Sequence, residues 1–65
     1  MDSKKLLAEA ISAHRIGDYL TAAKNYELAL VTDPGNTDVL HNYGLLLFRS
    51  GEQRLGLFLL ERALR

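Results

Sequence analysis

Residues 17–36 (GDYLTAAKNYELALVTDPGN) place a helical pattern between two turn signals. Gly17 tolerates the left-handed conformation that ends a helix, and Asp18 suits the positive N-terminal end of the next helix. Apolar residues then recur at intervals of three and four through 19–31, as they do on one face of a helix. The run 33–36 ends this pattern, because proline cannot continue a helix and Asp and Asn favour turns and caps. The stretch therefore predicts the end of one helix, a tight turn and a complete second helix.

The segments on either side carry the same pattern. Apolar residues fall at helical spacing in 4–16, in the segment that follows Asn36 and in 53–65. A second glycine–acid pair, Gly51-Glu52, separates the last two of these segments. Residues with β-branched side chains are few and scattered, which argues against strands. The sequence therefore predicts an all-α fold of four helices, arranged as two antiparallel helix-turn-helix hairpins in series, a fragment of an α-solenoid.

Length and composition limit the classes of function. At 65 residues the chain has room for one domain, 1–65, and its eight Lys and Arg balance its eight Asp and Glu. Nucleic-acid binding usually shows a basic excess, so we expect no nucleic-acid partner. The apolar runs are too short for a membrane span, and no secretory signal is visible. Because cysteine is also absent, we expect a cytoplasmic protein without disulfides or thiolate metal sites.

The sequence contains an internal repeat. A shift of 34 residues aligns Gly17 with Gly51, and turns then fall on turns and small residues on small residues. Ala22 aligns with Gly56 in this way, and small residues at such positions let two helices approach closely. The alignment indicates that one helical hairpin has been copied.

The 34-residue helix-turn-helix unit resembles the tetratricopeptide repeat, whose pattern places small and aromatic residues around a Gly-Asp-Tyr turn and ends near a proline. The first copy, about 3–36, matches this pattern closely. Its matching residues are Leu6, Ala10, Gly17, Asp18, Tyr19, Ala22, Tyr26, Ala29, Leu30, Asp33 and Pro34. The second copy, about 37–65, departs at Gln53 in the turn and at Gly56, and it stops before a second Asp-Pro. The resemblance implies a protein-interaction scaffold without catalysis of its own.

In such repeats the first helix of each hairpin lines a concave groove that holds a protein or peptide partner. The resemblance places the following residues in this groove: Lys4, Leu7, Ile11, His14, Asp38, His41, Asn42, Leu45 and Phe48. Their spacing is that of one helical face on each helix. The apolar members either bind a partner segment, with Phe48 as the expected anchor, or face the core. Only Asn42 matches the residues with which some family members clamp a C-terminal carboxylate, so no clamp is expected.

The sequence offers no arrangement of residues that carries chemistry. His14, Asp38 and His41 invite a metal site, but the two histidines are about two helical turns out of step and zinc needs three or four converging ligands. The serines and threonines lie in no nucleophile motif, and the five glycines occur singly rather than in a phosphate-binding loop. We therefore expect no enzyme activity, no metal and no cofactor.

The last segment, 53–65, is apolar around much of its circumference. Four of its residues are expected to lie open, namely Leu57, Phe58, Leu60 and Leu64. Leaving them open forfeits on the order of 6–10 kcal/mol of burial, and terminal repeats normally have a polar or covered outer face. Two alternatives to partner binding therefore stay open. One is self-association into a homo-oligomer through this face, and the other is an N-terminal fragment of a longer repeat protein.

Overall fold

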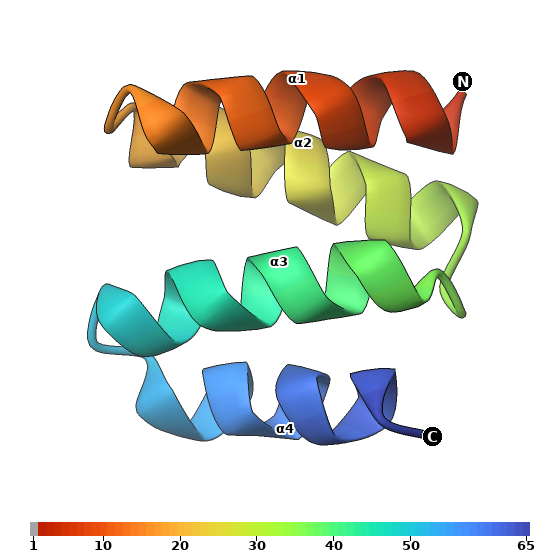
Figure 1. Ribbon diagram of the computed structural model, residues 1–65, viewed down its shortest axis with the longest axis vertical. Coiled ribbons are helices and arrows are strands. Elements are labelled where there is room, and N and C mark those ends of the chain that lie inside the picture. Colours follow the sequence, from red (N-terminus) through yellow and green to blue (C-terminus); the bar gives the residue numbers. More distant parts are fainter. Residues whose placement is uncertain (1) are drawn as a thin grey trace.

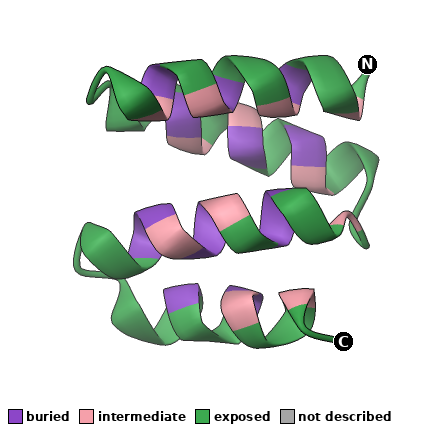
Figure 2. Ribbon diagram, viewed as in Figure 1, coloured by how far each residue is buried: buried purple, intermediate pink, exposed green. Residues whose placement is uncertain are grey.

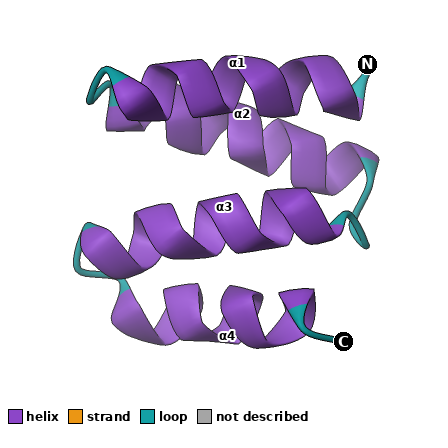
Figure 3. Ribbon diagram, viewed as in Figure 1, coloured by secondary structure: helices purple, strands orange, loops and turns teal. Residues whose placement is uncertain are grey.

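The computed structural model describes residues 2–65, which form four helices joined by short turns (Figure 1, Figure 3). The helices are α1 (Ser3–Arg15), α2 (Tyr19–Thr32), α3 (Thr37–Arg49) and α4 (Gln53–Ala63). The predicted all-α fold of two helical hairpins in series is confirmed. None of the four described helices combines the length and the apolar character that a membrane crossing requires.

Side chains just ahead of the first three helices fix where these helices begin. The carboxylates of Asp2 and Asp18 each accept a hydrogen bond from a backbone N–H in the first turn of α1 and α2, at 3.0 and 3.2 Å. Asn36 Oδ1 accepts two such bonds ahead of α3, at 3.0 and 3.2 Å. Each bond satisfies an N–H that has no partner within the helix. Glu52 stands in the same place before α4, but its side chain makes no cap bond with the described residues.

Both hairpin turns depend on a glycine. Gly17 and Gly51 adopt φ angles of 83° and 101°, in the left-handed region that strains residues with a Cβ. The N–H of the residue that follows each glycine then donates to the carbonyl five residues earlier, at 2.9 Å in the first turn and 2.8 Å in the second. This pattern closes the end of a helix and reverses the chain direction. The two turns predicted from the glycine–acid pairs therefore have the same geometry.

The helices follow one another across the molecule in chain order (Figure 1). α1 packs along α2 and α3 along α4, which makes two hairpins. α3 also contacts α2 and, to a smaller extent, α1, whereas among the described helices α4 contacts α3 alone. α3 is therefore the element that holds the two hairpins together.

Buried residues lie on the sides of the helices that face one another (Figure 2). Tyr26 of α2 and Val39 of α3 are fully buried. The ring of Tyr26 stacks on that of Tyr43, with centroids 5.6 Å apart, and this pair joins the two hairpins. Other aliphatic side chains complete the core, namely Leu6, Ala10, Ala13, Ala22, Ala29, Leu40, Leu46, Leu47 and Leu59.

Candidate interaction surfaces

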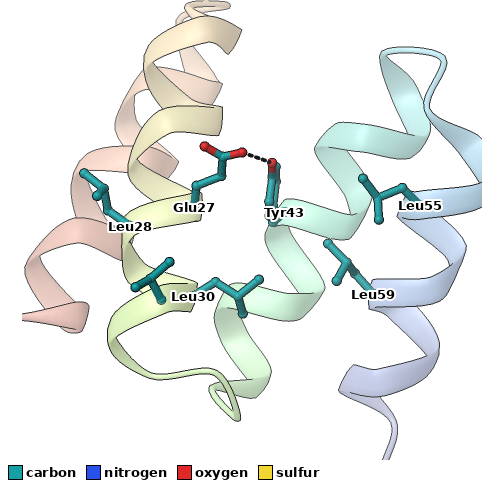
Figure 4. A pocket seen from close by; sticks show the side chains of 7 residues that line it. Glu27, Leu28, Leu30, Tyr43, Leu55 and Leu59 are labelled. Carbon is teal, nitrogen blue, oxygen red and sulfur yellow. Dashed lines mark hydrogen bonds between the residues drawn. The ribbon is translucent and has the colours of Figure 1, made fainter.

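An apolar groove of about 460 Å³ lies between α2 and α4, with α3 at its base. We call it the α2–α4 groove; its lining residues are Glu27, Leu28, Leu30, Val31, Tyr43, Leu55 and Leu59 (Figure 4). Tyr43 and Leu59 are buried, whereas Val31 is 79% and Leu55 46% exposed. The groove therefore combines a buried base with walls that present apolar side chains to solvent.

One side of this groove is polar. The Tyr43 hydroxyl donates a hydrogen bond to Glu27 Oε1 at 3.5 Å, shown as the dashed line in Figure 4. Burial raises the pKa of Tyr43 above its ordinary value, and the negative charge and hydrogen bond of Glu27 raise it further. The hydroxyl therefore keeps its proton at neutral pH and directs it at the carboxylate. Among the seven lining residues, Glu27 is the one that carries a charge.

The sequence prediction did not include the α2–α4 groove. Leu28 and Val31 lie outside the apolar stripe through which α2 packs on the core, and their spacing of three residues on one side of the helix is the signal that was available. On α4 the apolar residues surround the helix, so spacing alone does not tell which way Leu55 faces. The groove exists because α2 and α4 both pack on α3 without contacting one another.

The structure divides the residues that the family resemblance placed on the concave side of the first hairpin. Leu7 and Ile11 are half-buried and pack against the core. His14 is also half-buried, with Nδ1 3.1 Å from the Tyr26 hydroxyl oxygen. Lys4 is exposed. The two aliphatic side chains therefore contribute to the packing of the molecule, which is the second of the two roles considered for them.

On α3 the corresponding residues are more accessible. Asp38 and His41 are exposed, and the half-buried Asn42 donates from Nδ2 to the carbonyl of Asp38 at 2.8 Å. Leu45 is half-buried and Phe48 is 37% exposed. Of the four apolar residues that the resemblance placed in the groove, the two on α3, Leu45 and Phe48, are therefore the ones left accessible outside the core.

The four apolar residues predicted to lie open on α4 do not share one face. Leu57 and Leu64 are 48% and 88% exposed. Phe58 is 54% exposed but faces a different side, where it lines a hollow of about 570 Å³ beside the start of α3. Leu60 does not lie open as predicted, because it is half-buried and turned toward Gly44 of α3. Only Leu57 and Leu64 remain on an open apolar side.

The histidine of the first hairpin belongs to an aromatic cluster. The ring of His14 meets those of Tyr19 and Tyr26 edge-on, with centroid distances of 5.7 and 6.1 Å. Burial raises the pKa of Tyr26, so its hydroxyl stays protonated at neutral pH. Within residues 2–65 no three His, Asp or Glu side chains gather in a way that could hold a metal ion. His14 is therefore placed to orient the Tyr26 hydroxyl.

No protein-family model, curated protein or solved structure matches the chain. Function is therefore inferred from the chain's own residues. Two kinds of surface bear on it, the α2–α4 groove and the apolar side chains left exposed on α3 and α4.

Proposed function

We propose that the chain is a protein-interaction scaffold of the tetratricopeptide-repeat type, which holds an amphipathic helix of a partner protein in the α2–α4 groove. The observation that carries this proposal is the groove, whose buried base lies between two helices that present Val31 and Leu55. The 34-residue repeat and the Gly-Asp-Tyr turn at 17–19 support the family part of the proposal.

The shape of the groove favours a helix as the bound segment. Its walls are the sides of two helices that both rest on α3, and helices pack by seating rows of side chains in channels of this kind. Amphipathic helices bind apolar grooves through residues at helical spacing. Glu27 at the rim suits a Lys or Arg on the polar side of such a helix, and the Tyr43 hydroxyl orients that carboxylate.

The groove is proposed as a binding site without a reaction. Its lining is aliphatic apart from Glu27 and Tyr43. An acid–base catalyst works best with a pKa near the operating pH, whereas the pKa of Tyr43 is raised further above neutrality. The cysteine-free sequence supports placing this scaffold in the cytoplasm.

A second candidate for the same function is the open side of α3, to which the family resemblance points. Phe48 is 37% exposed there, and Leu45 is half-buried one helical turn away. A partner segment on this side would use Phe48 as its anchor, as aromatic residues often do. Because Phe48 does not line the α2–α4 groove, substitutions distinguish the two sites.

Selected peptides test which surface binds. The probe is an amphipathic helical peptide selected from a displayed library against the wild-type chain, with affinity measured by fluorescence anisotropy. We expect Val31→Glu to weaken binding about tenfold or more, because an apolar side chain contributes about 1.5–3 kcal/mol when buried. Ile16→Glu is the matched control. Ile16 is 81% exposed against 79% for Val31, but it lies in the turn between α1 and α2, outside the groove. Its affinity is expected to equal that of the wild type.

The outcomes separate the candidates. Loss of binding in Phe48→Ala with normal binding in Val31→Glu would place the site on α3 instead. Equal binding by the wild type and all three variants would contradict both candidate sites.

A further inference from the structure

The outer side of the second hairpin is an exposed and mainly apolar surface. The internal repeat identifies this surface. Several first-hairpin residues that pack against the shared core have their counterparts here, 34 residues later in the sequence. We call this surface the end face. Its exposed residues are His41, Phe48, Leu57 and Leu64, and the half-buried Leu45 and Leu60 complete the pattern. Phe48, Leu57 and Leu64 are 37%, 48% and 88% exposed.

The equivalent residues of the first hairpin show that a surface with this pattern packs against another helix. They are Leu7, Ile11, His14, Ala23, Tyr26 and Leu30. The aliphatic ones among them are partly buried and pack against the core that both hairpins share. Tyr26 stacks on Tyr43 of α3. In the first hairpin this pattern therefore receives another helix.

The opposite end of the molecule has different chemistry. The positions through which α3 meets the first hairpin hold Val39, Tyr43 and Leu46, all buried. The equivalent positions 34 residues earlier on α1 hold Lys5, Glu9 and Ser12, all exposed. Stacking the end face of one copy on α1 of another would remove these groups from water without partners, which is unfavourable. Head-to-tail association into open filaments is therefore disfavoured.

Charged residues on α4 make the end faces of two copies complementary to one another. Arg54 lies three residues before Leu57 and Glu61 lies four residues after it, so the three share one side of the helix. Arg54 and Glu61 are both exposed. When two α4 helices lie antiparallel and cross near Leu57, Arg54 of each copy comes beside Glu61 of the other. The formal net charge of zero adds no overall repulsion between copies.

We propose that the end face binds the same face of a second copy about a two-fold axis, with the two α4 helices antiparallel and Leu57 at the centre. Phe48 lies at the same level, because a Cβ on the neighbouring Gly56 would stand 2.7 Å from the Phe48 nitrogen. A specific dimer buries about 800 Å² per partner, which is about one sixth of the 4533 Å² of accessible surface. The α2–α4 groove lies on the other side of α4 and stays open in this dimer.

Solution mass tests the proposal. Light scattering on a sizing column, over a wide concentration range, is expected to show the mass rising from 7.3 kDa to twice that value. Leu57→Glu is expected to keep the chain monomeric, because it places a charge at the centre of the interface. Phe58→Glu is the matched control, since Phe58 is 54% exposed against 48% for Leu57 and faces another side. A wild-type monomer at every concentration, equal disruption by both variants, or a mass above that of a dimer would overturn the proposal.

A charge exchange at two exposed positions tests the antiparallel arrangement. Arg54→Glu and Glu61→Arg are each expected to raise the dimer Kd about three- to tenfold at low salt, because each brings like charges together. The double variant is expected to recover the wild-type Kd, since the pairs reform with their signs exchanged. A double variant that stays weak would overturn the antiparallel arrangement. Peptide binding in the α2–α4 groove is a separate readout, tested by comparing the wild type with Val31→Glu. Neither the mass measurement nor the charge exchange is expected to change it.

Discussion

Gly44 and Gly56 bring the backbones of α3 and α4 together. A Cβ on Gly56 would stand 2.7 Å from the Phe48 nitrogen and 2.8 Å from the Gly44 carbonyl oxygen, so backbone atoms fill the space. A Cβ on Gly44 would meet the Gly56 carbonyl oxygen at 3.0 Å and Leu60 Cγ at 2.9 Å. Without side chains at these two positions the helices pack more closely than two larger residues would allow. Gly35 differs, because a Cβ there would have no neighbour among the described residues within 4 Å.

Gly56→Ala is expected to lower the free energy of unfolding by about 2 kcal/mol, because the added methyl group forces the helices apart. Gly44→Ala is expected to cost less, since Leu60 can move part of the way. Gly35→Ala is the control and is expected to stay near the wild-type value. Urea unfolding followed by far-UV circular dichroism measures the three variants. A Gly56→Ala chain as stable as the wild type would contradict this account of the crossing.

Sequence reasoning reached part of this detail. The alignment of Gly56 with Ala22 correctly marks a position for a small residue. The side on which a large apolar residue of α4 faces was not available, because apolar residues surround the helix and leave no stripe. Leu57, Phe58 and Leu60 were therefore grouped together, whereas the structure turns them in different directions. Which of these residues becomes buried depends on where the neighbouring helix packs.

At the scale of the helices, the caps differ in strength. Asp18 and Glu52 occupy equivalent positions, with φ and ψ of −84° and 75° for Asp18 and −87° and 61° for Glu52. Asp18 accepts a hydrogen bond from the first turn of α2, whereas Glu52 makes no such bond to α4 in the described structure. Since the backbones are alike, the longer side chain of Glu52 accounts for the missing cap. Asp is a preferred residue at this position.

Glu52→Asp is expected to raise the free energy of unfolding by about 0.5–1 kcal/mol, because the shorter carboxylate can cap α4 as Asp18 caps α2. Thermal unfolding followed by circular dichroism measures the change. Glu52→Gln is the control, since it keeps the longer side chain and provides no cap. No gain in Glu52→Asp relative to the wild type would show that the first turn of α4 does not limit stability.

Helix boundaries were the part of the fold that the sequence predicted best. Their signals are local, as in the glycine–acid pairs and the run 33–36, and the structure ends and begins helices at these places. Asn was expected to favour a cap in this run, and Asn36 caps α3 because its Oδ1 accepts hydrogen bonds from two N–H groups. α4 ends at Ala63, two residues before the end of the segment 53–65 that the apolar pattern predicted.

At the scale of the whole molecule, two tyrosines connect the hairpins. The rings of Tyr26 and Tyr43 stack with an interplanar angle of 22°. Burial raises the pKa of both hydroxyls, and Glu27 raises that of Tyr43 further. The contact between the hairpins therefore depends on two phenols that remain protonated.

Stability is expected to fall at alkaline pH for this reason. In the unfolded chain a tyrosine ionises near pH 10, about its ordinary pKa, whereas these two keep their protons to higher pH in the folded state. The unfolded state then binds fewer protons than the folded state, so the free energy of unfolding falls as pH rises above about 10. Below that pH their contribution is fully present. Urea unfolding at successive pH values is expected to show a shallower fall for Tyr43→Phe than for Tyr19→Phe, and equal slopes would contradict the prediction.

The candidate surfaces were predicted less well than the helices. The α2–α4 groove requires knowing that α4 rests on α3 alone, and no local signal in the sequence states this. The end face was partly predicted, since Leu57 and Leu64 were expected to lie open. The internal repeat made this prediction possible, because it identifies 53–65 as the last helix of a repeat, whose outer side is normally polar or covered.

The difference between the two ends gives the molecule a direction in which it can lengthen. A duplicated 34-residue unit placed after α4 would seat its first helix on Phe48, Leu57 and Leu64, as α3 sits on the first hairpin. The same unit placed before α1 would instead meet Lys5 and Glu9. Tandem duplication of the gene segment would therefore be accepted at one end and rejected at the other. Longer descendants of such a chain would share their first hairpin and differ in how many follow it.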